Sequence, residues 1–221
     1  MPIYNSTDMD KTALFQLTYG LYVVGTFDGG RPVGCIINTC FQVTSENPIL
    51  AVSLNKNNFT LDAIRRCGKF SLSIIAEESD TSVIGSFGFR SSRDADKYAD
   101  YGYDVMAGVP IVKGKFAGRL VLEALNFVDA ETHVVVLGRL VDAEKGEGTP
   151  MTYDYYHRVV KGKAPKNAPT YRGEEEEKAT SGKRKFRCDI CGYEVESDGP
   201  LPADYVCPIC KATVDHFVEV K

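Results

Sequence analysis

Short apolar runs rich in β-branched side chains alternate with turn residues along the chain up to about residue 158. Runs of about four to eight residues bounded by Gly, Pro, Asn or Asp are typical of β-strands rather than helices. Two of the runs, 120–128 and 133–141, are unusually long and β-rich. The predicted strands cover residues 21–26, 33–39, 41–44, 49–54, 70–75, 120–128 and 133–141.

Turn and capping residues predict how these strands are connected. The sequence Asp28-Gly29-Gly30 between the first two strands predicts a tight hairpin. Asp8 is a plausible N-cap for a first helix that ends at Gly20, and Gly68 closes a second helix. The predicted helices cover residues 8–19, 59–66 and 79–87. The fold class expected is mainly β with a few helices, arranged as an antiparallel β-barrel.

The composition changes abruptly after Tyr156. Residues 161–185 contain almost no aliphatic side chains, and prolines, glycines and charged residues replace them. We expect a solvated, flexible linker over 161–184, between a globular domain at 1–160 and a small domain at 185–221. Such a linker would allow the small domain to change its position.

Overall composition excludes several classes of protein. The 221 residues carry a formal net charge of −4, and 43% of them are hydrophobic, which is ordinary for a soluble globular chain. We therefore expect no nucleic-acid partner and no membrane partner. No signal peptide is visible at the N-terminus, so a cytoplasmic location is expected.

Seven cysteines form two groups of different character. Cys35, Cys40 and Cys67 are scattered, whereas four cysteines form two C-x-x-C pairs near the C-terminus. In a reducing compartment such pairs predict a tetrahedral metal site rather than disulfides. A segment of fewer than about 40 residues also needs a metal or disulfides to fold. We expect Cys35 and Cys67 to be small buried hydrophobic residues.

Zinc and iron both suit an all-sulfur tetrahedron, and cysteine spacing does not choose between them. Gly192 permits a turn whose N–H could point at a sulfur, and Pro208 stiffens the second pair. Three aromatic residues could keep water from the metal: Tyr193, Tyr205 and Phe217.

The segment CDICGYEVESDGPLPADYVCPIC resembles rubredoxin, a family that binds one iron through four cysteines and carries one electron. The resemblance implies that the iron ligands are Cys188, Cys191, Cys207 and Cys210. Lys211 stands where that family usually has Gly, so the second cysteine turn is expected to carry strain of about 1 kcal/mol.

A second candidate site lies where two strands approach a helix. Asn38, Thr39 and Cys40 could edge a flat heteroaromatic ring with their polar groups. The polar cluster before the second helix could bind an anion or could be ordinary strand-end polarity with a helix cap. This cluster comprises Ser53, Asn55, Lys56, Asn57 and Thr60. No G-x-G-x-x-G sequence follows a strand, so a Rossmann site is not expected.

The order of segments over residues 19–142 resembles the flavin reductase-like, FMN-binding split-barrel family. The segments are GLYVVGT, NTCFQVTSENP, SLNKNNFT, GKFSLSII, RSSRDADKY and ETHVVVLGRLVDA. The resemblance implies an FMN cofactor and a homodimer. It assigns the isoalloxazine to Asn38, Thr39, Cys40 and the strand-end Thr26, and the phosphate to Ser53, Asn55, Lys56 and Thr60. The family usually has Ser in place of Cys40.

Four further residues have two interpretations each. His133 opens a strand, where a lone histidine is usually structural, but the resemblance places it near the nicotinamide as a substrate contact. Arg90, Arg93 and Lys97 form either a solvated helix face or contacts to cofactor or dinucleotide phosphates.

The two resemblances together imply an NAD(P)H:rubredoxin oxidoreductase that carries its own electron acceptor. This organisation resembles the high-molecular-weight rubredoxins of anaerobic bacteria, which implies delivery to a flavodiiron protein that reduces oxygen or nitric oxide. Two alternatives stay open. One is a flavoredoxin-like carrier reduced by another protein, and the other is a flavin reductase with a zinc-ribbon tail for protein binding. The sequence does not choose between NADH and NADPH.

Overall fold

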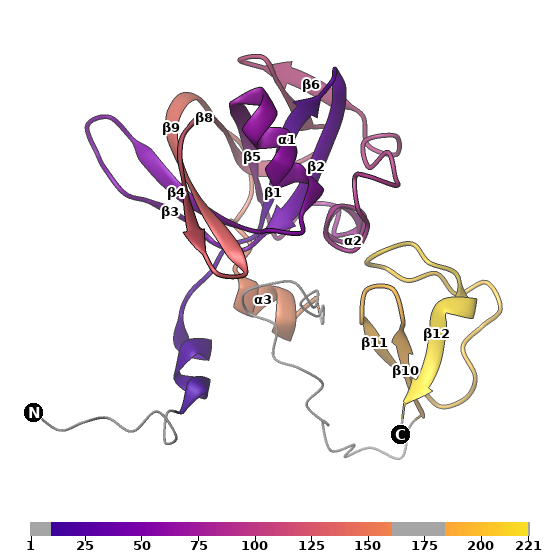
Figure 1. The fold of residues 1–221 in the computed structure, drawn as a ribbon. Helices are drawn as coiled ribbons and strands as arrows, with labels where there is room; N and C mark the ends of the chain where they lie inside the picture. Colours follow the sequence, from indigo (N-terminus) through magenta and orange to yellow (C-terminus); the bar gives the residue numbers. More distant parts are fainter. Residues whose placement is uncertain (1–9, 161–183, 221) are drawn as a thin grey trace, which may run out of the picture.

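A computed structural model describes residues 10–160 and 184–220 (Figure 1). Its main sheet is antiparallel, with strand order β2-β1-β5-β8-β9-β4-β3. The strands are β1 (Tyr22–Asp28), β2 (Arg31–Ile37), β3 (Cys40–Gln42), β4 (Ile49–Asn55), β5 (Lys69–Ile75), β8 (Phe116–Ala130) and β9 (His133–Lys145). A separate hairpin pairs β6 (Tyr103–Met106) with β7 (Val109–Val112).

Helices and a second sheet complete the fold. The helices of the first part are the 3-10 helix η2 (Lys11–Gln16), α1 (Phe59–Cys67), α2 (Ser82–Gly88) and α3 (Tyr153–Arg158). The C-terminal part contains β10 (Arg184–Cys188), β11 (Glu194–Ser197), the 3-10 helix η3 (Val214–His216) and β12 (Phe217–Val220), with strand order β11-β10-β12. The mainly β class with a few helices is therefore confirmed.

The main sheet curls around α1, which buries its apolar side inside the curve (Figure 1). Leu61 and Ile64 of α1 share one core with residues from strands far apart in the sheet, such as Cys35 of the edge strand β2 and Val52 of β4. Register shifts in β8 near Leu122 and Ala124 contribute to the curvature, because β-bulges bend a strand and increase its twist. A second core lies between α2, α3 and the other side of β1 and β5.

Strong local signals led to correct predictions. Asp28 pairs with Arg31 across the hairpin, and Gly29 and Gly30 have φ values of 57° and 84°. Both central residues of that turn type require positive φ, which glycine allows. The N-cap Asn58 accepts a hydrogen bond from the Thr60 amide at 3.0 Å, and α1 ends at a left-handed Gly68.

The predicted helix at 8–19 is wrong in kind and in extent. A 3-10 helix covers Lys11–Gln16, and Asp10 caps it by accepting a hydrogen bond from the Thr12 amide at 2.9 Å. Asp8, the predicted cap, lies outside the described residues. Leu14 and Leu17 are exposed, so this segment lacks the packing that a short α-helix needs. Gly20 pairs with Thr152 in an isolated bridge instead of ending a helix.

The third predicted helix starts later than expected. Ser79 lies outside α2 because its hydroxyl donates to the Lys115 carbonyl oxygen and accepts from the Ala76 amide. The hairpin β6–β7 and helix α3 were not predicted. The predicted flexible linker falls almost wholly on residues 161–183, outside the described residues. No helix within 10–160 or 184–220 is long and apolar enough to cross a bilayer.

Candidate functional site

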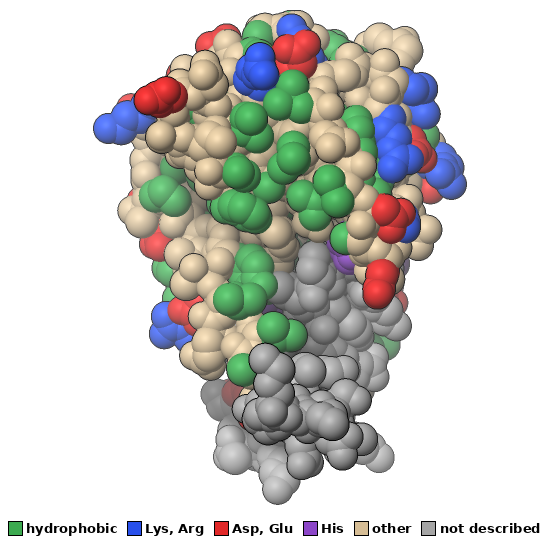
Figure 2. Space-filling model, turned by 60° about the vertical axis from the view of Figure 1, so that its left-hand side comes forward, with side chains coloured by type: hydrophobic (Ala, Val, Ile, Leu, Met, Phe, Trp, Pro, Cys, Tyr) green, Lys and Arg blue, Asp and Glu red, His purple; other side chains and the backbone are tan. Residues whose placement is uncertain are grey.

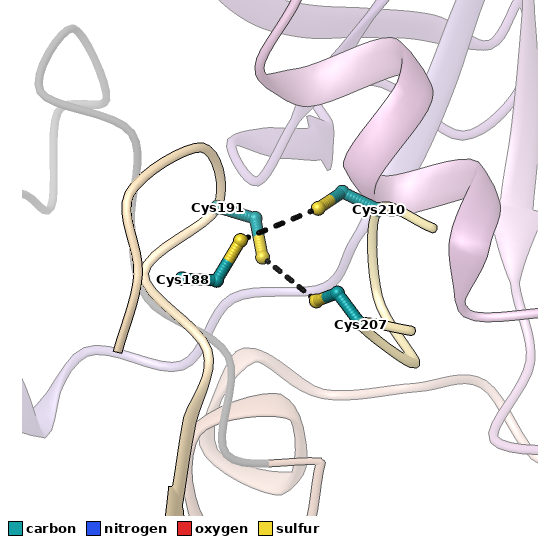
Figure 3. A group of neighbouring side chains, drawn as sticks. All are labelled: Cys188, Cys191, Cys207 and Cys210. Atoms are coloured by element: carbon teal, nitrogen blue, oxygen red, sulfur yellow. Dashed lines mark hydrogen bonds between the residues drawn. The ribbon is translucent and has the colours of Figure 1, made fainter. Parts of the chain in front are cut away.

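Four cysteines converge at one point of the C-terminal part (Figure 3). Their sulfurs all lie within 4.8 Å of one another. The Sγ atoms of Cys188 and Cys210 are 3.6 Å apart, and those of Cys191 and Cys207 are 3.4 Å apart. Sulfurs bound to one tetrahedral metal at about 2.3 Å would be about 3.8 Å apart, whereas disulfide sulfurs are bonded at about 2.05 Å. The cluster therefore fits a single metal ion after a small expansion.

The two cysteine turns have matching backbones. The Gly192 amide donates to the Cys188 carbonyl oxygen at 2.9 Å, and the Lys211 amide donates to the Cys207 carbonyl oxygen at 3.0 Å. The first turn also directs an N–H at a sulfur, as predicted, because the Tyr193 amide hydrogen-bonds to the Cys191 sulfur. Gly192 and Lys211 are both left-handed, with φ values of 74° and 60°. For Lys211 this conformation costs about 1 kcal/mol, which agrees with the strain expected from the sequence.

The sulfur cluster is closed to solvent, since all four cysteines are buried. Tyr193 and Phe217 pack against the cluster, and the Tyr205 ring contacts the Phe217 ring edge-on at a centroid distance of 5.2 Å. Hydrogen bonds from the Cys191 and Cys210 thiols lower the pKa of Cys207. Zinc and iron bind cysteine as thiolate, so a metal at this cluster would displace the protons of the remaining thiols.

The structure brings together most residues of the second candidate site. β3 pairs with β4 so that Cys40 lies opposite Val52, and the Ser53 amide donates to the Thr39 carbonyl oxygen at 3.2 Å. The Thr39 hydroxyl donates to Asn38 Oδ1 at 3.1 Å. The buried Asn38 amide and the half-buried Thr39 hydroxyl beside a strand end suit the polar edge of a flat ring.

Thr26 and Cys40 are limited in the hydrogen bonds that they could offer a ligand. The Thr26 hydroxyl is buried and donates to the Lys69 carbonyl oxygen at 2.7 Å. Burial raises the pKa of Cys40 to about 12, so its thiol stays protonated and keeps a weak donor in place of the family's usual serine. Neither residue can act as an anionic group.

The turn between β4 and α1 is built from short polar side chains. Asn55 Oδ1 accepts from the Asn57 amide at 2.9 Å, and Asn58 caps the helix. Thr60 is buried beside the Cys35 thiol, whose pKa is raised chiefly by burial. The helix-cap interpretation of this segment is therefore confirmed, and it does not exclude anion binding at the same turn.

Lys56 is the cation of this turn, and it already has an anionic partner. Its ammonium lies 2.5 Å from an Asp129 carboxylate oxygen, and both side chains are exposed. The hydrogen bond from Lys56 is the main cause that lowers the pKa of Asp129. An exposed ion pair adds little stability, so a phosphate could displace Asp129 at small cost.

Three guanidinium groups surround Phe59, the first residue of α1. Those of Arg31, Arg66 and Arg93 lie 5.8, 5.8 and 5.6 Å from the ring centroid. Asp28 pairs with Arg66 at 2.8 Å, which leaves this group net positive. The sequence suggested only Arg93. Arg66 lies two turns after Phe59 in α1, and Arg31 comes from β2, a distant segment that nothing local marks as a neighbour.

His133 lies opposite Asn55 in the β4–β9 register, beside the polar turn. Its Nδ1 is 2.8 Å from the Thr132 hydroxyl. The structure thus brings His133 to the candidate phosphate-binding residues, and both interpretations of the residue fit this position.

Lys97 has neither of the two roles suggested by the sequence. Its ammonium is buried and donates to the carbonyl oxygens of Gly34 and Phe87, both at 2.9 Å. Burial lowers the pKa of Lys97 to about 8. Ser92 also donates to Gly34, at 2.9 Å, so this segment fastens α2 to β2.

The remaining cysteines behave differently from each other. Cys35 is buried, as predicted, but Cys67 is exposed, and that prediction is wrong. Cys67 is the last residue of α1, where the helix has left the core that buries Leu61 and Ile64.

Comparisons with known proteins agree with this geometry. The flavin reductase-like domain model matches residues 14–163. The flavin reductase PheA2 superposes with a TM-score of 0.57 at 20% identity, covering 65% of this chain and 93% of that one. The chain therefore belongs to the flavin reductase-like family.

Relatives also account for the C-terminal part. High molecular weight rubredoxin from Moorella thermoacetica is 39% identical over 96% of this chain and 100% of its own length. The NAD(P)H ferric-chelate reductase of Archaeoglobus fulgidus is 37% identical over 74% of this chain and 98% of its own. Rubredoxin from Megasphaera elsdenii is 43% identical over 16% of this chain and 94% of its own. The chain is thus an oxidoreductase-type flavoprotein with a rubredoxin-like four-cysteine cluster.

Proposed function

We propose that this protein transfers electrons from NAD(P)H through FMN to an iron ion held by its four C-terminal cysteines, and from there to a flavodiiron-type protein. The observation that carries the proposal is a closed, tetrahedrally spaced sulfur cluster attached to a flavin reductase-like barrel. We assign residues 1–160 to the barrel, 161–184 to a linker and 185–221 to the iron domain.

The electron balance explains why the two parts are joined. FMN accepts a hydride, which carries two electrons, while a thiolate-bound ferric ion accepts one. One NAD(P)H therefore reduces two ferric ions and releases one proton. The barrel converts a two-electron donor into a one-electron supply.

Cys188, Cys191, Cys207 and Cys210 are the proposed iron ligands. Their burial and the Tyr193 and Phe217 side chains that pack on them keep water from the metal. A site that changes charge without exchanging ligands needs such a closed surround, because reorganisation of solvent would slow the transfer. Zinc would fit the sulfurs equally well but has no redox step.

The proposed FMN site combines the strand-end and turn residues. Asn38, Thr39 and Cys40 would edge the isoalloxazine, with the buried Thr26 behind it. The phosphate would be bound at the β4–α1 turn by Ser53, Asn55, Lys56 and Thr60.

Charges near this turn favour anionic ligands. The arginine group around Phe59 adds positive charge at the start of α1. His133 would contact the nicotinamide substrate, since it lies opposite Asn55. Hydride transfer depends on stacking and alignment, so His133 is assigned no acid or base role.

We also propose a homodimer, with a second copy covering an exposed apolar face. Figure 2 shows hydrophobic side chains gathered on one side of the molecule. Strands β3, β8 and β9 carry four exposed large hydrophobic residues: Phe41, Leu125, Val128 and Val141. Such an apolar patch is typical of a protein–protein interface. The location we expect is the cytoplasm, where cysteines stay reduced.

The flavodiiron-type partner is supported only by charge. Residues 185–221 contain four basic and seven acidic residues, which gives a net charge of −3. An acidic carrier would bind a partner with a basic surface, and raising the ionic strength would slow the transfer.

Two measurements separate this function from its alternatives. Ferric thiolate absorbs strongly in the visible range and zinc does not, so the spectrum of iron-replete native protein tests the zinc-ribbon alternative. Stopped-flow mixing with NADH and with NADPH should bleach the flavin on a catalytic timescale. Absence of bleaching with both would leave the flavoredoxin-like carrier as the better description.

A further inference from the structure

The second cysteine turn packs directly on the backbone of α2. A Cβ atom built on Gly85 would lie 2.5 Å from the Ile209 carbonyl oxygen and 2.6 Å from Cys210 Cα. Real Cβ atoms are not found that close to backbone atoms, so any side chain at this position would push the two parts of the chain apart. Figure 3 shows Cys210 as the ligand beside this helix.

Other barrel residues complete the contact around the cluster. Phe89, which follows α2, and Val160, which follows α3, pack against the cysteines. Tyr156 of α3 is buried, and its pKa is raised first by that burial and then by the Cys191 thiol. The cluster therefore lies against a wall formed by α2, α3 and the residues that follow them (Figure 1).

Helix α2 also packs against β2, the strand that leads to the proposed flavin site. A Cβ atom on Gly34 of β2 would lie 3.0 Å from the Phe87 ring of α2. The buried Lys97 joins the carbonyl oxygens of the same two residues. β2 ends at Ile37, just before Asn38.

We propose that α2 is the docking surface for the protein's own rubredoxin-like domain, and that Gly85 is the residue that permits it. Docking presents Cys210 to the barrel, so electrons enter the iron from the Cys210 side. The direction of electron flow rests on the function proposed above, whereas the docking contact does not.

The test compares two glycine-to-alanine changes in the same helix. Gly85→Ala places a methyl group into the Ile209–Cys210 backbone. Gly88→Ala is the matched control, because its Cβ would meet only Ile36 side-chain atoms at 3.5 Å, an ordinary contact. Both changes raise helix propensity by similar amounts, so a difference between them reports on docking.

Docking is measured on the full-length metal-loaded protein by hydrogen exchange of residues 82–89 and 205–212 and by the radius of gyration in solution. We expect Gly85→Ala to lose protection in both segments and to increase the radius, while Gly88→Ala matches the wild type. Should Gly85→Ala impair folding, Phe89→Glu provides a second test by placing a charge against the cluster, and the same losses are expected. Protection and radius unchanged in both interface variants would overturn the docking surface.

Electron transfer is then followed after mixing with NADH. Gly85→Ala should slow iron reduction at least about tenfold relative to Gly88→Ala, while flavin reduction stays within about twofold. Equal iron reduction in the two variants would refute entry from the Cys210 side. Loss of protection in Gly85→Ala together with no flavin reduction in the wild type would support docking and refute the proposed function.

Discussion

The barrel and the C-terminal part bury their interiors by different means. The barrel contains two cores of aliphatic and aromatic side chains, drawn from strands and helices far apart in sequence. In residues 184–220 the four cysteines form the centre of the only described core, and the other buried hydrophobic residues there are Phe186, Ile209 and Ala212. The barrel therefore depends on apolar burial, and the small part depends on its metal.

Removing a metal ligand should have the largest effect, confined to the C-terminal part. Metal binding contributes about 10–16 kcal/mol in small zinc domains, and three apolar side chains cannot replace it. Cys191→Ser should abolish hydrogen-exchange protection over residues 186–220, while the barrel keeps its melting temperature. Cys67→Ser is the control, because Cys67 is exposed. If residues 186–220 of Cys191→Ser kept their protection from hydrogen exchange, the C-terminal part would not depend on its metal.

A large-to-small change in the barrel core should destabilise the barrel and leave the C-terminal metal site intact. Phe70 on β5 is fully buried in the first core, and Phe70→Ala should lower the free energy of unfolding by about 3–5 kcal/mol. The ferric-thiolate spectrum should stay unchanged at temperatures below the barrel transition. Loss of the ferric-thiolate absorption below the temperature of the barrel transition would mean that the two parts fold as one unit.

Lys97 should make barrel stability depend on pH. Its folded pKa of about 8 lies below the ordinary 10.5, because burial disfavours the charged form. The unfolded chain therefore binds more protons between these values, and the stability contribution of Lys97 rises with pH by up to about 3 kcal/mol.

The measurement is urea unfolding at pH 7 to 9.5 for the wild type and Lys97→Met. The wild type should gain stability relative to the variant as pH rises, since the neutral amine still donates to both carbonyls. Parallel pH profiles would show that Lys97 stays protonated inside the barrel over this range, which would contradict its lowered pKa.

The smallest predicted effect concerns the two cysteine turns. Lys211→Gly should stabilise the metal-loaded C-terminal part by about 1 kcal/mol, because Lys211 occupies a left-handed conformation. Gly192→Ala should destabilise it by a similar amount at the equivalent position of the first turn. Resistance to denaturant-induced metal loss measures both. Equal resistance in the two variants would contradict the strain assigned to Lys211.

Local chemistry explains which parts of the structure the sequence predicted. The Asp28–Arg31 hairpin, the Gly68 end of α1 and the four-cysteine cluster each depend on residues near one another, or on one metal. Helix α2 began late because Ser79 bonds to Lys115, which is distant in sequence. Nothing local could show this partner.

In the candidate site, too, contacts between neighbouring segments were predicted and contacts between distant segments were not. Adjacent strands brought Thr39 and Ser53 together as expected, because β3 and β4 form a hairpin. The arginine group around Phe59 and the Gly85 contact join segments more than 25 residues apart in sequence. Such pairs are fixed by tertiary packing, which no single-segment pattern encodes.

The most direct test of the account is an anaerobic titration of the iron-replete native protein with NADH, following flavin and ferric-thiolate absorption together. With two electrons for FMN and one for iron, complete reduction should require about 1.5 NADH per chain, and both bands should bleach. An iron band that stays oxidised after the flavin is fully reduced would contradict electron transfer between the two parts.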